Sequence, residues 1–145
     1  MTNKIPLQAP GHMGVDYESR VDFDRLRKYR IGRAKESLNN SKCGSFLLFD
    51  FYNIRYTTQT WIGGALGDKM TRYALLTRNG EPMLWDFGSA VRHHQKYSPW
   101  LKTENNRPGM LGMRGAVAPS AGLMESAVRE IKGLLEDAGV DNEPV

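Results

Sequence analysis

The residues of this chain that could perform chemistry are few, and they are scattered along its 145 positions. The histidines are His12 and the adjacent pair His93 and His94. Successive side chains on a helix point about 100° apart, whereas two metal ligands on one helix usually stand three or four residues apart. The histidine pair is therefore a poor chelate. Because no Cys, His and carboxylate residues gather at ligand spacing, the sequence predicts no metal site in this chain.

No serine or cysteine stands in a recognisable nucleophilic setting. The G-x-S-x-G elbow is absent, and the single cysteine, Cys43, lies beside a glycine in a manner typical of a small packing residue. The stretch 61–71, WIGGALGDKMT, is rich in glycine but lacks the order of a phosphate-binding loop, because Asp68 separates Gly67 from Lys69. We interpret this stretch as a connection between two strands.

Paired carboxylates are the remaining option for acid and base chemistry. Asp50 and Asp86 each end an apolar, strand-like run, and Asp68 lies between them in the sequence. Two carboxylates that meet can divide acid and base roles, but aspartates at strand ends commonly serve turns. The sequence leaves open whether any two of them meet, so we assign no catalytic residue.

The elements that would position these residues include a β-hairpin. Residues 73–77 and 82–87 have strand-like composition, and Asn79 and Gly80 between them tolerate the positive φ angles of a tight turn. Residues 46–49 are four consecutive apolar residues, which indicates a strand that is covered on both faces. This pattern predicts a sheet with helices on its faces.

The first predicted helix, residues 24–38, carries much of the excess positive charge, which is +4 with a pI near 9.3. Its basic residues are Arg25, Arg27, Lys28, Arg30, Arg33 and Lys35. They lack the aromatic and glycine spacing of an RNA-binding sheet. We therefore interpret them as a solvated helix face with acidic partners at Asp22, Asp24 and Glu36, of which Asp22 or Asp24 also caps the helix. Nucleic-acid binding remains the alternative.

Two further helices follow the predicted hairpin. Ser89 is the expected N-cap of a short helix, AVRHHQKY, that ends near Pro99, and residues 105–119 read as a loop with one short strand. The last helix reaches residue 138, with Ser120 as N-cap and Gly139 in the left-handed position after its end. Its apolar stripe comprises Leu123, Met124, Ala127, Val128, Ile131, Leu134, Leu135 and Ala138.

Length and composition indicate a single domain. We expect residues 1–21 to form an extended N-terminal arm and residues 22–145 to form an α/β domain with a mixed sheet of about five or six strands flanked by helices. No apolar run approaches the roughly 20 residues that cross a bilayer, and no secretory signal is recognisable. The sequence therefore predicts a cytoplasmic protein that does not enter a membrane. Only VDNEPV follows Gly139, which we interpret as the end of a fragment.

Two stretches of the chain carry a resemblance to a known family. They are LLFDFYNIRYTTQT, residues 47–60, and YALLTRNGEPMLWDF, residues 73–87. With the arginine-rich helix before them, they resemble the N-terminal domain of the creatinase, prolidase and aminopeptidase P family over about residues 22–138. Within that family, FDFYNIRYTT and MLWDF are most similar to bacterial dimethylsulfoniopropionate lyases and their relatives.

The resemblance implies a two-domain parent enzyme. In this family, a C-terminal "pita-bread" domain binds two divalent metal ions and performs hydrolysis of Xaa-Pro peptides or related substrates, or lyase chemistry in the subgroup just named. None of its ligand motifs occurs here, so the resemblance implies that this portion is non-catalytic and holds no cofactor. Its expected partners are its own catalytic domain, a second subunit in a homodimer, and a small-molecule or peptide substrate. We expect neither a membrane nor a nucleic acid as partner.

The resemblance also implies a role for residues that follow the buried strand, as a rim that shapes substrate access to the neighbouring catalytic cleft. The candidate residues are Asn53, Arg55, Tyr56, Trp61, Asp68 and Arg72. In this hypothesis, Trp61 offers an apolar wall, Asp68 faces a cationic substrate group, and Arg72 faces a carboxylate.

The alternative is a purely structural role for the same residues. Asn53 would then form an Asx-turn, Arg55 would form a surface ion pair, and Tyr56 and Trp61 would pack under the loop. One departure from the family pattern leaves the conformation of the loop and the substrate subgroup open. Many relatives have a glycine soon after the RY-x-T segment, whereas residues 58–60 here are Thr-Gln-Thr.

Overall fold

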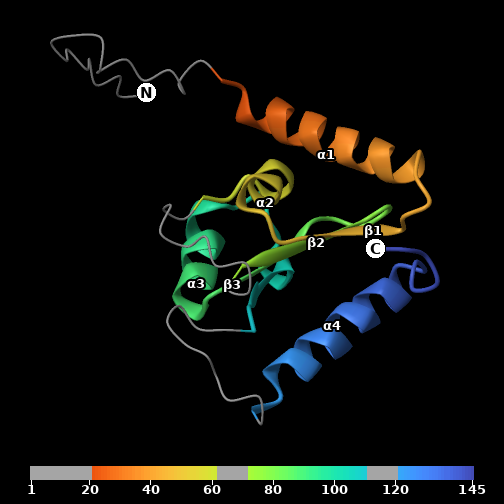
Figure 1. The fold of residues 1–145 in the computed structure, drawn as a ribbon. Coiled ribbons are helices and arrows are strands. Elements are labelled where there is room, and N and C mark those ends of the chain that lie inside the picture. The colour runs from red at the N-terminus through yellow and green to blue at the C-terminus, as the bar shows by residue number, and fades with distance from the viewer. Residues whose placement is uncertain (1–20, 62–71, 111–120) are drawn as a thin grey trace, which may run out of the picture.

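The structure, a computed structural model, describes residues 21–61, 72–110 and 121–145. Its centre is a mixed sheet with the strand order β1-β2-β3-β4 (Figure 1). The strands are β1 (Ser45–Leu48), β2 (Tyr73–Thr77), β3 (Met83–Asp86) and β4 (Asn106–Pro108). Neighbouring strands are antiparallel except β3 and β4, which are parallel. The predicted α/β class with a mixed sheet is confirmed. The described residues form four strands rather than five or six.

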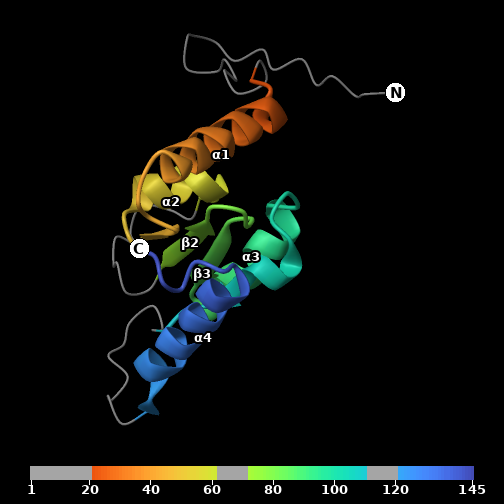
Figure 2. The same ribbon diagram turned by 90° about the vertical axis from the view of Figure 1, so that its right-hand side faces the viewer.

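Helices cover both faces of the sheet. They are α1 (Phe23–Asn39), α2 (Phe51–Thr58), α3 (Gly88–Tyr97), the 3-10 turn η3 (Thr103–Asn105) and α4 (Leu123–Asp137). Figures 1 and 2 show α1 and α2 on one face, α4 on the opposite face, and α3 at one end of the sheet. Within the described ranges, none of these helices is both long enough and apolar enough to span a bilayer. The predicted arm, except for its last residue, lies outside the described residues.

Alternating side chains of the strands divide the core into two halves. On the side of α4, Tyr73 and Leu75 of β2 pack with Trp85 of β3 and with Ile131 and Leu134 of α4. On the other side, Ala74 of β2 and Leu84 of β3 pack with Ile54 of α2, while Leu76 packs with Ala34 and Leu38 of α1. Both central strands are therefore buried on both faces, as their apolar composition indicates.

The predicted hairpin is confirmed, but its turn differs from the prediction. Leu75 of β2 lies opposite Met83 of β3, and residues 78–82 connect the two strands. Neither Asn79 nor Gly80 has a positive φ angle. A connection of this length reverses the chain with ordinary backbone angles, so the Asn-Gly pair does not form the two-residue turn that it favours.

The segment after β1 forms a helix rather than a continuation of the strand. Asp50 is the N-cap of α2, and its Oδ1 accepts hydrogen bonds from the backbone N–H groups of Tyr52 and Asn53, each at 3.0 Å. At the other end, Gln59 is the C-cap with a left-handed φ of 52°. The strand therefore does not deliver the predicted rim residues directly, because helix α2 carries them.

Helix α4 has a left-handed glycine near each of its ends. Gly122 is the N-cap with a φ of 67°, and the predicted cap, Ser120, lies outside the described residues. The predicted left-handed residue after the helix is confirmed, because Gly139 has a φ of 66°. The N–H groups of Gly139 and Val140 donate to carbonyls of the last helical turn, which is the Schellman arrangement. The predicted apolar stripe is only partly buried, because Leu123, Met124 and Val128 are exposed.

The prediction for the start of α3 was wrong. Phe87 is the N-cap and makes no side-chain capping bond, so Ser89 lies inside the helix. Asp86, at the end of β3, precedes this helix directly, and its Oδ1 accepts a hydrogen bond from the N–H of Phe87 at 2.9 Å. The strand and the helix are therefore joined without a loop in which Ser89 could act as a cap.

The residues after α4 return to the beginning of β1. Pro144 O accepts a hydrogen bond from Gly44 N at 2.9 Å. Arg78 forms an ion pair with Glu143, and its Nη2 donates to the carbonyl of Cys43 at 3.0 Å. These contacts hold the C-terminal residues against the edge of the sheet at β1 (Figure 1). The Cys43 side chain packs against the core cluster beside α1, as predicted for a packing residue.

Candidate functional site

Polar residues gather at the edge of the sheet where β1 and β3 end and β2 begins. This convergence follows from the antiparallel order, which places the start of one strand beside the ends of its two neighbours. Asp50 follows β1, Arg72 precedes β2, and Asp86 ends β3. The two aspartates do not form a carboxylate pair, because Asp50 caps α2 whereas Asp86 binds Arg72 and a histidine of α3.

A buried cluster of Arg72, Asp86 and His94 occupies this edge. Arg72 Nε and His94 Nε2 lie 3.1 and 3.0 Å from the same oxygen, Asp86 Oδ2. The three side chains are only 1–2% exposed. An ionised carboxylate can only accept hydrogen bonds, so in this pair the Nε2–H of His94 is the donor and Asp86 Oδ2 is the acceptor. We term these three residues the buried cluster.

Two threonines extend the buried cluster toward α2. Arg72 Nη2 donates to Thr60 Oγ1, which lies 2.7 Å from Thr58 Oγ1. Thr58 Oγ1 in turn lies 2.7 Å from the carbonyl oxygen of Ile54. Burial lowers the pKa of the Arg72 guanidinium, while the negative charge of Asp86 acts in the opposite direction. The network thus connects α2, β2, β3 and α3 through the Arg72–Asp86 ion pair and through hydrogen bonds.

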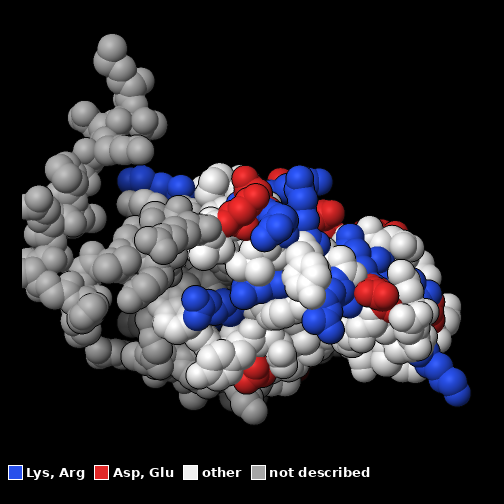
Figure 3. All heavy atoms as spheres, turned by 90° about the horizontal axis from the view of Figure 1, so that it is seen from above, with Lys and Arg blue, Asp and Glu red and all other residues white. Residues whose placement is uncertain are grey.

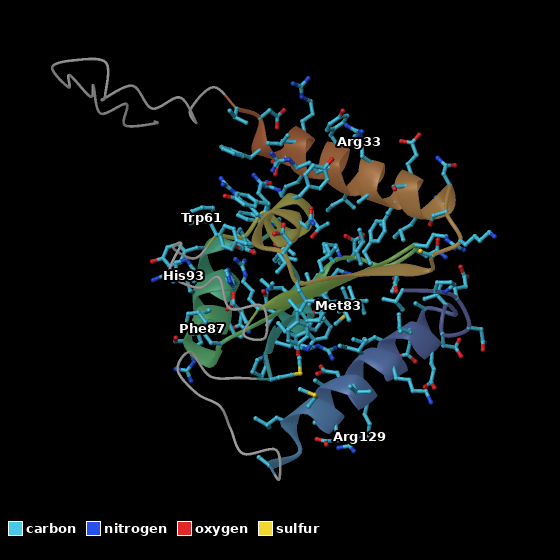
Figure 4. All side chains as sticks on the ribbon, viewed as in Figure 1. Arg33, Trp61, Met83, Phe87, His93 and Arg129 are labelled. Atoms are coloured by element: carbon cyan, nitrogen blue, oxygen red, sulfur yellow. The ribbon has the colours of Figure 1, made fainter. Side chains whose placement is uncertain are left out.

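An aromatic surface lies directly over the buried cluster. The Arg72 guanidinium is 5.5 Å from the centroid of the Phe51 ring, and Phe51 packs edge-on against Trp61 with a centroid distance of 4.8 Å. The Arg55 guanidinium lies 4.4 Å from the Trp61 ring. Trp61 is 49% exposed and Tyr52 is 74% exposed. We term Phe51, Tyr52, Arg55 and Trp61 the aromatic rim, and Figure 4 shows Trp61 at the end of the molecule formed by α2 and α3.

The structure brings some of the predicted rim residues together and separates others. Arg55 and Trp61 stack on each other at the surface. Asn53 is exposed, and its backbone N–H donates to the cap residue. Its side chain accepts no hydrogen bond from a described residue, so no Asx-turn forms there. Tyr56 lies on the side of α1, with the guanidinium of Arg30 5.4 Å from its ring. Arg55 thus contacts an aromatic ring, and among the residues that the structure describes it does not form the surface ion pair of the structural alternative.

The other two predicted rim residues, Arg72 and Asp68, are not part of the exposed rim that the structure describes. Arg72 is buried against Asp86 and Thr60, so its guanidinium already has an internal carboxylate partner. Asp68 lies outside the described residues. The aromatic rim also includes Phe51 and Tyr52, which the sequence analysis did not select. These two residues lie in the first turn of α2, and no clear sign in the sequence indicates that a helix begins directly after Asp50.

His94 is the principal residue of this edge that the sequence analysis missed. It lies one turn after Ala90 on α3, and both are buried. The spacing of Ala90 and His94 is the only signal in the sequence that His94, and not His93, faces inward. His93 is exposed and packs against Tyr97 with a centroid distance of 4.7 Å. The adjacent histidines therefore lie in different environments, as expected for neighbours on a helix.

The basic residues of α1 are largely engaged with neighbouring side chains. Arg27 pairs with Asp24 and lies 4.3 Å from the Trp100 ring. Arg30 lies over Tyr56 and Arg33 over Tyr29. Of the predicted acidic partners, Asp24 pairs with Arg27, and Asp22 is the N-cap of the helix. The other contacts are to aromatic rings rather than to carboxylates.

Within residues 21–61, 72–110 and 121–145, no three His, Cys, Asp or Glu side chains gather in a way that could hold a metal ion. The described edge is suited to binding a ligand, because a stacked arginine and exposed aromatic rings lie above the buried cluster. No family model matches the chain. A search among curated proteins also finds no match to it.

Proposed function

We propose that this chain is a non-catalytic N-terminal domain of a metal-dependent hydrolase of the Xaa-Pro peptidase or creatinase type. The proposal rests on the resemblance carried by residues 47–60 and 73–87. In it, the domain supports a cytoplasmic homodimer and shapes substrate access to a catalytic domain. The two divalent metal ions belong to that catalytic domain, and no step of the reaction is assigned to residues of this chain.

The observation that carries the proposal is the construction of the aromatic rim. Trp61 is exposed, yet it is held between the Phe51 ring and the Arg55 guanidinium. Phe51 in turn rests on Arg72, whose position is fixed by Asp86. An exposed indole with fixed neighbours can contact a substrate without first being ordered, which lowers the entropic cost of binding. This is the property that a wall of a substrate channel requires.

A narrower proposal concerns the subgroup of the parent enzyme. The stretches FDFYNIRYTT and MLWDF favour a dimethylsulfoniopropionate lyase-like relative, whose substrate carries a sulfonium cation and a carboxylate. The exposed face of Trp61 suits the cation, because aromatic rings attract positive charge. Arg55 beside it suits the carboxylate. A peptide substrate with a free carboxylate would use the same two side chains.

The coding sequence beyond codon 145 provides the first test. We expect a downstream series of codons for metal-ligating aspartate, histidine and glutamate residues. A stop codon directly after Val145 in the native gene would contradict the two-domain proposal.

Steady-state kinetics of the complete enzyme then test the rim. Replacing Trp61 with alanine should lower kcat/KM about tenfold, mainly through KM, since the change removes a binding wall and not a reacting group. Tyr29→Ala is the matched control, because Tyr29 is a comparably exposed aromatic residue on α1, outside the rim. If Trp61→Ala and Arg55→Ala both leave kcat/KM unchanged, the rim does not contact substrate.

A further inference from the structure

A groove lies beside the C-terminal end of α2, lined by residues other than those of the aromatic rim. It lies between α1, the end of α2 and the segments around residues 81–82 and 100–105, and it encloses about 540 Å³. This volume is within the usual range of ligand sites, which is roughly 300–1,000 Å³. Its lining includes Lys28, Ile31, Gly32, Glu81, Trp100 and Lys102. We term it the α1 groove.

The aromatic wall of the α1 groove is held in place by neighbouring groups. Trp100 Nε1 donates to the carbonyl of Thr58 at 2.8 Å, and the Arg27 guanidinium lies 4.3 Å from the ring. Arg27 is itself held by Asp24 and by Gln59, whose Oε1 is 3.3 Å from Nη1. Although fixed in this way, Trp100 remains 39% exposed. The groove therefore offers a pre-ordered apolar surface, which favours binding.

The charges around the α1 groove do not balance. Asp24 is paired with Arg27, and Glu81 lies 3.8 Å from Lys35. Among the residues that the structure describes, Lys28 and Lys102 have no ion-pair partner. One of them belongs to α1 and the other to the facing segment, so they stand on different walls. Figure 3, a view from above, shows Lys and Arg side chains over the described part of this face, with Asp and Glu side chains among them.

We propose that the α1 groove binds a short acidic peptide segment. An apolar side chain of the peptide would lie against Trp100 and Ile31, and carboxylates on either side of it would meet Lys28 and Lys102. Complementary charge sets the orientation and speeds the encounter, while the apolar contact contributes most of the affinity. Separate positive charges on either side of an apolar surface suit an apolar side chain flanked by carboxylates better than a continuous phosphate backbone, which favours a peptide over a nucleic acid. The proposal does not depend on the function of the aromatic rim.

Gly32 allows the groove to be filled without disturbing the fold. A Cβ atom at Gly32 would have no neighbour within 4 Å, although this residue lines the groove. Gly32→Leu therefore places a side chain in the groove and also raises helix propensity. Gly133 of α4 is the matched control, because a Cβ there also meets no atom within 4 Å and the residue lies outside the groove. Comparison of Gly32→Leu with Gly133→Leu separates groove filling from helix stabilisation.

The experiment uses the 145-residue chain and an end-blocked pentapeptide that has a central leucine flanked by two glutamates on each side. The same peptide with glutamine in place of glutamate is the neutral control. Titration followed by the NMR signals of the indole N–H groups reports the site directly, because the chain has three tryptophans and only Trp100 lines the groove. We expect the Trp100 signal to shift with a Kd of about 1 mM or lower, while the signal of buried Trp85 stays in place.

The variants are expected to change this binding selectively. Gly32→Leu should weaken it at least about tenfold, and Gly133→Leu should leave it within about twofold of the wild type, because only the former occupies the groove. Lys28→Gln combined with Lys102→Gln should weaken it about fivefold or more, whereas Lys132→Gln on α4 should not, since surface charge pairs act locally. Thermal unfolding of each variant checks that the fold is retained.

Three results would overturn the proposal. The first is equal affinity for the acidic and the neutral peptide, since the groove would then not select charge. The second is equal loss of binding in Gly32→Leu and Gly133→Leu. The third is tighter binding of a thymidine decanucleotide than of the peptide at about 150 mM salt, lost again in Gly32→Leu, because this would assign the groove to nucleic acid.

Discussion

Asp86 Oδ2 lies 3.1 Å from Arg72 Nε, and both side chains are buried where β3 ends and β2 begins. A buried ion pair is not in itself a large source of stability, because both charges lose their hydration. Its effect is conditional: each charge is tolerable only while the other is present. The pair thereby links the edge of the sheet to the aromatic rim, since Arg72 also supports Phe51.

Removing the charge of Asp86 should therefore be strongly destabilising. We expect Asp86→Asn to lower the free energy of unfolding by about 3–5 kcal/mol, because the Arg72 guanidinium would stay buried without its counter-charge. Urea denaturation measures the loss, and Asp137→Asn at the exposed end of α4 is the control. The double variant Arg72→Met/Asp86→Leu should be less destabilised than Asp86→Asn. A double variant that is worse than the single one would show that the pair stabilises the fold outright.

The two adjacent histidines should respond very differently to substitution. His94→Ala removes a buried hydrogen bond to Asp86 and leaves a small cavity, so we expect a loss of about 2–3 kcal/mol in the free energy of unfolding. His93→Ala changes an exposed residue of the same helix and should stay within about 0.5 kcal/mol of the wild type. Chemical denaturation of both variants provides the comparison. Similar losses would mean that α3 does not face the sheet as described.

Tyr73 should make the protein sensitive to alkaline pH. Burial, assisted by the negative charge of Glu130, raises the pKa of the Tyr73 hydroxyl to about 12, while a backbone hydrogen bond from Met110 acts in the opposite direction. The ordinary pKa of tyrosine is about 10, so its contribution is complete below pH 10 and is lost as the pH rises from about 10 to 12. At pH 11 the loss attributable to Tyr73 is about 1 kcal/mol.

The measurement is the change in the free energy of unfolding between pH 9 and pH 11. Other groups also titrate in this interval, so the informative quantity is the difference between the wild type and Tyr73→Phe, which cannot ionise at this position. We expect the variant to lose less stability over the interval. Equal losses would show that the hydroxyl titrates normally in the folded protein.

Alanine substitutions at two glycines should change the stability of the protein in opposite directions. A Cβ atom at Gly44 would fall 2.6 Å from Val140 Cβ, so Gly44→Ala must displace the residues that follow α4. We expect a loss of about 1–3 kcal/mol in the free energy of unfolding. Gly32→Ala meets open space within a helix and should instead stabilise the protein by up to about 1 kcal/mol. Thermal unfolding distinguishes the two, and a stable Gly44→Ala variant would argue against the packing at Val140.

Local signals in the sequence were sufficient to predict the hairpin and the end of α4. The strands around Asn79 and the left-handed glycine at position 139 depend on residues that are close together in the chain. The helix at residues 51–58 was harder to predict from the sequence, because the isoleucine and threonines of this segment favour extended structure. The cap formed by Asp50 and the packing of Ile54 against the sheet outweighed that preference.

The buried cluster could not be predicted in the same way. Asp86 meets Arg72 because the register places Trp85 opposite Tyr73, and this register is fixed by the hairpin and not by either charge. The pattern of α4 indicated an apolar stripe, but its width does not tell how much of it the sheet covers. Val128 thus has the periodicity of a core residue and the exposure of a surface residue.

The return of the C-terminal residues to β1 has a practical consequence for labelling. Since Gly44 N donates to Pro144 O, any polypeptide joined after Val145 departs beside the start of β1, which is an edge strand among the described strands. A short hydrophilic linker at this point would keep a fused reporter clear of the exposed backbone groups of β1. An extended apolar linker could instead pair with these groups as an additional strand and alter the sheet.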